Sequence, residues 1–195
     1  MASNLSEVAV VMAALLAVPA LGVPLFPLQL LWINLLTDGL PALALGVDPA
    51  HPGTMQRPPR DPRQRLLDAP HLRRLAWRGG AMALGAVGAL LVAHHVLGLA
   101  PASSRTVLFS TLVVAQAAYA WTVRRPAGTR GRLRPNRWLV VATLGALALQ
   151  VLVVTVGVLG RVFDTVPLDA SEWALVVAGG LVGPALIAGV ARSRR

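Results

Sequence analysis

Three polar residues stand close together in an otherwise apolar stretch of the sequence. Asn34, Thr37 and Asp38 are spaced i, i+3 and i+4, so a helix would place all three on one face. Gly39 and Pro41 follow, and a proline removes a backbone donor and disfavours helix just before it. We therefore expect the helix to loosen there and expose carbonyl oxygens. A carboxylate, an amide oxygen, a hydroxyl and free carbonyls are ligands that suit a hard cation such as Ca2+.

A second polar pair occurs near the start of the chain. Asn4 and Glu7 are spaced i and i+3 in another apolar stretch, and the glycine and proline of residues 22–24 would turn the chain back after it. Two helices joined by so short a turn form an antiparallel hairpin. The two polar faces could then meet across the hairpin.

Charged residues at membrane depth are costly, at about 2.5 to 3.5 kcal/mol each, and are rarely kept without a function. The spacing of these polar residues therefore favours an ion site. The alternative interpretation assigns Asn34 and Thr37 to hydrogen bonds between helices and Asp38 to the capping of a helix end. Glu7 has an alternative of its own, because a residue so near the start of the chain could lie among the lipid headgroups.

The composition indicates a membrane protein. Of the 195 residues, 55% are hydrophobic and 13% are charged, and the mean hydropathy is +0.65. So high an apolar content excludes disorder. Soluble domains carry about 25% charged residues, so the low charge content disfavours an ordinary soluble enzyme. The net charge is +10, but the basic residues are all arginines between apolar blocks, which argues against a nucleic-acid partner. The lack of cysteine excludes disulfides, thiolate zinc sites and thiol catalysis.

The apolar blocks predict an all-α polytopic membrane protein, a bundle of six transmembrane helices of about 20 residues each. The expected spans are residues 5–21, 25–45, 75–99, 106–123, 138–159 and 173–190. We treat residues 1–195 as one transmembrane domain, with an ion-site hairpin over 1–46, a cytoplasmic loop over 47–74 and four supporting helices over 75–195. Small residues in the third span would let neighbouring helices approach closely; these are Gly80, Ala81, Gly85 and Gly88.

The distribution of arginine predicts the topology. Sixteen of the eighteen arginines fall in segments on one side of the spans, residues 57–78, 124–137 and 192–195. The other side holds Arg105 and Arg161. Arginine-rich loops face the cytoplasm, so we expect both termini there, as an even number of spans also requires. The chain is predicted to be a multi-pass protein of the cell membrane, surrounded by the lipid bilayer.

Specific motifs resemble a known family. Residues 28–42, LQLLWINLLTDGLPA, closely resemble the sixth transmembrane helix of P-type cation ATPases of the calcium-pump type. Residues 55–62, MQRPPRDP, are similar to the cytoplasmic loop after that helix, and residues 3–8, SNLSEV, to the middle of the fifth helix. The segments occur in the order and spacing of the family. The later spans match its last four helices in number and topology, so the chain resembles the fifth to tenth helices.

The resemblance implies a ligand set for a transported cation. The matching residues of the family coordinate Ca2+, and Asp38 would be the shared central ligand. In this chain the implied metal ligands are Asn4, Glu7, Asn34, Thr37 and Asp38. The transported ion would be Ca2+, although Mn2+ accepts the same oxygen ligands.

The chain also departs from the family pattern. It contains no Asp-Lys-Thr-Gly-Thr phosphorylation motif and no lysine, and we recognise no nucleotide site and no catalytic residue. The eighth helix of the muscle calcium pump supplies a carboxylate, whereas the corresponding span here offers only Gln116, Tyr119 and Thr122. We expect Gln116 and Gln150 to form hydrogen bonds between helices.

Two functions follow from these observations. The first is the membrane-embedded C-terminal portion of a cation-transporting P-type ATPase, which carries part of the ion site and is no ATPase alone. Its partner would be the missing N-terminal half of the pump. The alternative is a stand-alone, non-catalytic membrane protein that binds or regulates a pump. An unrelated six-helix channel is disfavoured by the density of family motifs.

Overall fold

The fold was obtained as a computed structural model, which describes residues 1–48, 68–124 and 135–193. In residues 38, 192 and 193 the description covers the backbone alone. Within these ranges the chain is helical, without β-strands. The prediction of an all-α fold is therefore confirmed.

The N-terminal part forms a short helix followed by a longer, composite one. Its elements are α1 (Ala2–Ala17), the 3-10 turn η1 (Pro19–Leu21), α2 (Pro27–Ile33), the π-helical segment η2 (Asn34–Gly39) and α3 (Leu40–Gly46). The segments α2, η2 and α3 follow one another without a break, so they form one continuous helical rod.

The remaining elements form the larger part of the bundle. They are α4 (Ala69–Leu91), its π-helical extension η4 (Val92–Val96), α5 (Pro101–Val123), α6 (Arg137–Thr155), α7 (Gly157–Phe163) and α8 (Ala170–Ser193). Asp68 caps α4, because its carboxylate accepts a 2.8 Å hydrogen bond from the backbone N–H of His71. This cap explains why α4 begins ahead of the expected position.

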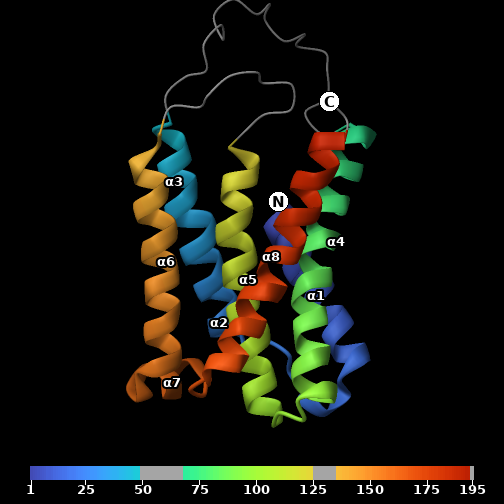
Figure 1. The fold of residues 1–195 in the computed structure, drawn as a ribbon, viewed down its shortest axis with the longest axis vertical. Coiled ribbons are helices and arrows are strands. Elements are labelled where there is room, and N and C mark those ends of the chain that lie inside the picture. The colour runs from blue at the N-terminus through green and yellow to red at the C-terminus, as the bar shows by residue number, and fades with distance from the viewer. Residues whose placement is uncertain (49–67, 125–134, 194–195) are drawn as a thin grey trace, which may run out of the picture.

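Within the described residues, five helices are long and apolar enough to cross a membrane, and the chain is a multi-pass membrane protein. They are Pro27–Gly46, Ala69–Val96, Pro101–Val123, Arg137–Thr155 and Ala170–Ala191. The first expected span is a shorter apolar helix, α1, and its N-terminal end lies partway along the bundle (Figure 1). The fifth expected span ends at Thr155, because the extended backbone of Val156 separates α6 from α7.

The two ends of the bundle differ in charge. The end of α3, the start of α4, the end of α5, the start of α6 and the end of α8 lie together at one end (Figure 1). The described arginines near those helix ends are Arg73, Arg74, Arg78, Arg124 and Arg137. The opposite end has Arg105 and Arg161. This asymmetry agrees with the topology expected from the sequence, although the arginines of residues 49–67 and 125–134 lie outside the described residues.

Glycine allows α4 and α8 to pack closely. A Cβ atom on Gly85 would collide with the carbonyl oxygen of Gly179, and one on Gly183 would lie 2.7 Å from Cα of Met82. Such distances leave no room for a side chain. Gly88, also expected at a helix contact, has open space around it. The tight contact is therefore restricted to one face of α4.

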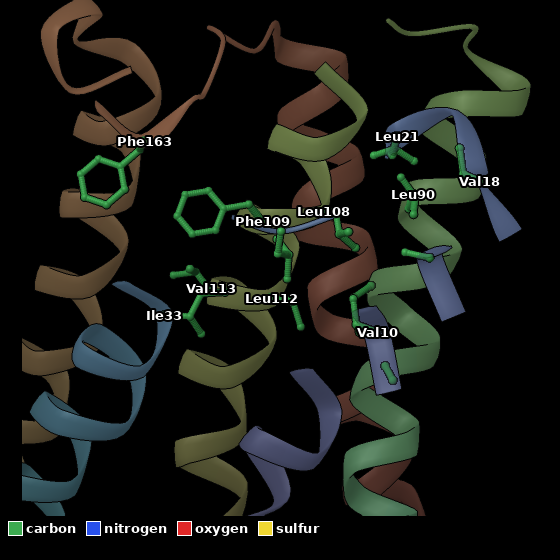
Figure 2. Close-up of a cluster of buried hydrophobic side chains, with 14 of the residues drawn as sticks. Val10, Val18, Leu21, Ile33, Leu90, Leu108, Phe109, Leu112, Val113 and Phe163 are labelled. Carbon is green, nitrogen blue, oxygen red and sulfur yellow. The ribbon is translucent and has the colours of Figure 1, made fainter. Parts of the chain in front are cut away.

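Helix α5 is the centre of the bundle. In its most apolar window 72% of the residues are buried, against 33 to 44% in the other four spans. Figure 2 shows Phe109, Leu112 and Val113 of α5 between Ile33 of α2 and Val10 of α1, within one buried apolar cluster. Side chains from both sides of the bundle thus meet on α5.

The two limbs of the expected hairpin pack on different neighbours. Helix α1 lies against α4, whereas η2 and α3 contact α5 and α6. The limbs are joined by a short turn in which Gly22 has a φ of 67°, a conformation that favours glycine. The hairpin is therefore open, and α5 takes part in the contact between its polar faces.

Candidate cation site

A buried polar cluster joins three elements of the bundle. Glu7 comes from α1, Asn34 and Thr37 come from η2, and Gln116 comes from α5. The cluster lies in spans that are otherwise apolar, so each polar group needs a partner within the protein. We call these four residues the polar cluster.

The carboxylate of Glu7 is the centre of the polar cluster. The side chain is 6% exposed. Its Oε1 accepts a 2.9 Å hydrogen bond from Nε2 of Gln116, and its Oε2 accepts a 3.2 Å hydrogen bond from Nδ2 of Asn34. Glu7 therefore lies in the protein interior and not among the headgroups, and it contacts Asn34 across the hairpin.

The hydroxyl of Thr37 meets two other oxygens. Its Oγ1 lies 2.6 Å from the carbonyl oxygen of Ile33 and also within hydrogen-bond distance of Oε1 of Gln116. A hydroxyl carries a single proton and can donate to only one of these acceptors at a time. Three oxygens therefore converge where one proton is available.

The backbone supports this convergence. The α-helix gives way to π-helical geometry over Asn34–Gly39, directly before the turn that contains Pro41. This confirms the expected loosening of the helix. The helix widens from α-helical to π-helical geometry over these residues and then continues into α3. Single π-helical turns inside α-helices are frequent at functional sites because they redirect side chains.

The side-chain amide of Asn34 uses its nitrogen in the described hydrogen bonds. Its Nδ2 donates to Leu30 O at 2.9 Å as well as to Glu7, and none of the described hydrogen bonds uses its Oδ1. The amide oxygen is therefore available as a ligand on the face of η2 that approaches α1.

The other candidate residues are placed differently. Asn4 is exposed, and none of the described contacts joins it to the polar cluster. The side chain of Asp38 lies outside the described part of the structure, while its backbone belongs to η2. The five ligands of the sequence interpretation are thus represented in the described cluster by Glu7, Asn34 and Thr37.

Gln116 is the member of the polar cluster for which the sequence predicts only hydrogen bonds between helices. Its hydrogen bonds between helices are confirmed, and their partners are two of the expected ligands. The available signal was a lone amide within an apolar span. Tyr119 and Thr122 of the same helix do not join the polar cluster; Thr122 donates to the carbonyl oxygen of Tyr119.

A cation held here would meet mainly neutral oxygens. Among the described residues there is no group of three or more His, Cys, Asp or Glu side chains that could hold a metal ion. The described oxygen donors are one carboxylate, a hydroxyl, two side-chain amides and a backbone carbonyl. Such a mixture suits a hard cation with six to eight oxygen ligands better than a zinc ion.

A second polar network lies beside the first. Gln150 on α6 accepts a 3.1 Å hydrogen bond from Nε1 of Trp32 and donates to Oγ of Ser110 at 3.1 Å. The expected role of Gln150 between helices is thereby confirmed. The network joins α2, α5 and α6.

The described helices define a multi-pass helical membrane protein with a buried polar cluster between its helices. The family model described as "Cation transporting ATPase, C-terminus" matches residues 22–191. The chain belongs to this family and corresponds to the C-terminal membrane region of cation-transporting ATPases.

Individual relatives agree with the family match. The chain is 33% identical to the "Calcium-transporting ATPase" of Bacillus subtilis, with 100% of the chain and 22% of that protein aligned. It is 32% identical to the "Probable cation-transporting ATPase F" of Mycobacterium bovis, over 90% of the chain and 19% of that protein. A "Calcium-transporting ATPase" of Plasmodium falciparum is 28% identical over 89% of the chain and 18% of the relative. The chain thus spans about a fifth of the length of these relatives.

Proposed function

We propose that the chain carries part of the Ca2+ site of a P-type calcium-transporting ATPase. The proposed ligands are Asn4, Glu7, Asn34, Thr37 and Asp38, and the geometry adds Gln116. Glu7, Asn34, Thr37 and Gln116 are supported by their convergence in the polar cluster. Asn4 and Asp38 are included because their sequence context resembles that of the family.

The convergence of oxygens around Thr37 carries the proposal. Oγ1 of Thr37, Oε1 of Gln116 and the carbonyl oxygen of Ile33 share one hydroxyl proton. Glu7 is adjacent to these oxygens, because its Oε1 accepts a hydrogen bond from the same amide group of Gln116. Its carboxylate adds a negative charge to the site. A cation among these oxygens could be coordinated by several of them at once, and burial would strengthen its attraction to the carboxylate.

Ca2+ is favoured as the ion for two reasons. The ligands are hard oxygen donors, and Ca2+ accepts six to eight of them in irregular geometry. The Bacillus and Plasmodium relatives are also described as calcium-transporting. Mn2+ takes similar ligands and is the competitor to be tested.

We assign the ATP-driven step to segments of the pump other than this chain. The relatives are about five times as long as the aligned region, which leaves room for nucleotide-binding and phosphorylation segments. The helices described here would contribute ligands and transmit movement to them. On this proposal the chain works together with the N-terminal part of a pump.

The test is a graft of residues 1–195 in place of the corresponding region of a complete calcium pump. Phosphorylation by ATP is then measured as a function of Ca2+ or Mn2+ concentration. We expect Ca2+-dependent phosphoenzyme in the graft, and loss of that dependence with Asp38→Asn or Glu7→Gln, because each removes a charge from a site of low dielectric. Thr37→Val and Asn34→Ala remove neutral ligands and should have intermediate effects.

Gln150→Leu is the control, because it removes a buried amide from the neighbouring network and leaves the polar cluster intact. It should retain its Ca2+ dependence. Undiminished Ca2+ dependence in both Asp38→Asn and Glu7→Gln would overturn the site assignment. A graft that responds to Mn2+ and not to Ca2+ would overturn the choice of ion.

A further inference from the structure

Arg105 contacts the turn of the hairpin from the first turns of α5. Its Nε donates to Val23 O and its Nη2 donates to Leu21 O, both at 3.0 Å. Its guanidinium carbon also lies 4.5 Å from the centroid of the Phe26 ring, a cation–π contact. One side chain thus holds the connection between α1 and α2 at three points.

The same guanidinium reaches the connection between α7 and α8. Nη1 of Arg105 lies 2.8 Å from Oδ2 of Asp164. Asp164 follows α7 and has a φ of 51°, in the left-handed region that asparagine and aspartate tolerate better than most residues. We call Arg105, Leu21, Val23 and Asp164 the Arg105 clamp.

The Arg105 clamp is more than a surface ion pair. The side chain of Arg105 is only 12% exposed, although that of Asp164 is 62% exposed. Exposed pairs contribute little to stability. Here, however, separate nitrogens of one planar group reach two backbone carbonyls and one carboxylate, an arrangement that the guanidinium fork allows and a lysine ammonium does not reproduce.

The clamp lies where the elements of the polar cluster come together at one end of the bundle. Helix α1, which carries Glu7, runs into the clamped turn, and α2 leads from that turn to η2. Helix α5 runs from Arg105 itself to Gln116, a distance of about 16 Å along the helix. The relative positions of the three elements therefore depend on how the turn is fixed to α5.

We infer that Arg105 is a positioning residue for the cation site. It fixes the turn of the hairpin against the start of α5 and thereby aligns Glu7 and Thr37 with Gln116. The inference rests on the proposed function of the polar cluster. It assigns to Arg105 an effect on cation affinity without contact with the ion.

Other contacts keep the bundle together when the clamp is removed. Gln29 donates to Phe163 O at 2.9 Å, and the rings of Trp32 and Phe163 pack edge to face with centroids 4.8 Å apart. These contacts join α2 to the end of α7 independently of Arg105. Loss of the guanidinium should therefore loosen the turn without unfolding the chain.

The first measurement tests the position of the hairpin. The chain has no cysteine, so two introduced cysteines can carry spin labels without background labelling. Leu15 on α1 and Val158 on α7 are suitable sites, because both are exposed. We expect a narrow distance distribution in the labelled chain and a broadened or shifted one after Arg105→Ala.

The second measurement tests the consequence for the cation. In the grafted pump, Arg105→Ala should weaken the apparent Ca2+ affinity about tenfold, the effect of losing hydrogen bonds from a charged group, with little change in maximal phosphorylation. Arg105→Lys keeps the charge but replaces the three guanidinium nitrogens with a single ammonium nitrogen, so it should be intermediate. Asp164→Ala should have a smaller effect that is not additive with Arg105→Ala.

Arg161→Ala is the matched control, because it removes an arginine from the same end of the bundle and from outside the clamp. It should change neither the distances nor the Ca2+ affinity.

If Arg105→Ala leaves the distances or the affinity as they were, the inference is overturned. If the unmutated graft shows no Ca2+ dependence, the proposed function fails, and the spin-label distances still decide whether Arg105 fixes the hairpin. If Arg105→Ala does not fold, Arg105→Lys and Asp164→Ala give the same comparison.

Discussion

Gln116 on α5 donates a 2.9 Å hydrogen bond to the carboxylate of Glu7 on α1, two residues that are 109 positions apart in the sequence. The same amide group presents its oxygen to the hydroxyl of Thr37 on η2. Gln116 therefore satisfies a carboxylate with its nitrogen and adds an acceptor with its oxygen. This dual contact joins both limbs of the hairpin to the central helix.

Replacement of Gln116 tests the value of this contact. Gln116→Leu removes one of the donors to a buried carboxylate, and the loss of a hydrogen bond to such a group costs about 1 to 3 kcal/mol. We expect a lower Tm for the purified chain in detergent, measured by tryptophan fluorescence. Gln150→Leu, in the neighbouring network, shows how much of the loss follows from removing any buried amide. A smaller loss for Gln116→Leu than for Gln150→Leu would contradict the special position of Gln116.

Gln116→Glu should couple stability to the cation. The substitution places a second carboxylate beside Glu7, and two like charges repel in a buried site. We expect a lower Tm without Ca2+ and a larger rise in Tm on addition of Ca2+ than in the unmutated chain, because ligand binding stabilises the folded state. An equal rise in both chains would argue against a cation at this position.

The contact between α4 and α8 should be sensitive to a single methyl group. Gly183→Ala would bring a Cβ to 2.7 Å from Cα of Met82, so the two helices must separate. Overpacking of this kind typically costs about 1 to 3 kcal/mol. Gly88→Ala on α4 meets nothing within 4 Å and is the control. Thermal unfolding of the two variants should therefore differ, and equal Tm values would contradict the packing described here.

The topology can be tested with reporters fused after Gly98 and after Arg132. The arginine distribution predicts that position 132 is cytoplasmic and position 98 is on the other side. A reporter active only outside the cytoplasm should then respond after Gly98 and not after Arg132. The opposite pattern would overturn the assignment of both termini to the cytoplasm.

Acid should weaken the N-terminal cap of α8. The backbone N–H of Glu172 and then the hydroxyl of Ser171 donate to Asp169, and these hydrogen bonds hold the pKa of the Asp169 carboxyl below its usual range. A carboxyl whose pKa is lower in the folded chain stabilises the fold above its unfolded pKa of about 3.9, and the contribution is lost as the pH falls through the folded pKa.

Asp169→Asn keeps a good capping residue but cannot ionise. The unmutated chain should therefore have a higher Tm than this variant at about pH 7. This difference in Tm should shrink as the pH is lowered below about 4. Thermal unfolding at both pH values measures it. An advantage that is constant across this range would contradict the assigned role of the charge.

Local patterns in the sequence determined the helices and part of the site. Blocks of apolar residues about 20 long predict membrane helices, because each backbone group must be satisfied within its own helix in lipid. The spacing of Asn34 and Thr37 placed both on one face, and Pro41 predicted the irregular helix that the structure shows as η2. These features depend on residues within one or two turns, so a pattern of that length is enough to predict them.

Only the tertiary structure decided which helices meet. The packing of α1 on α4, the central position of α5 and the place of Gln116 in the polar cluster depend on contacts between residues distant in sequence. Nothing in the spacing of Asn4 and Glu7 shows that one is exposed and the other buried, because the winding of one helix does not say where its neighbours lie. Small residues such as Gly85 and Gly183 permit close approach, but the complementary surface of the other helix determines whether it occurs.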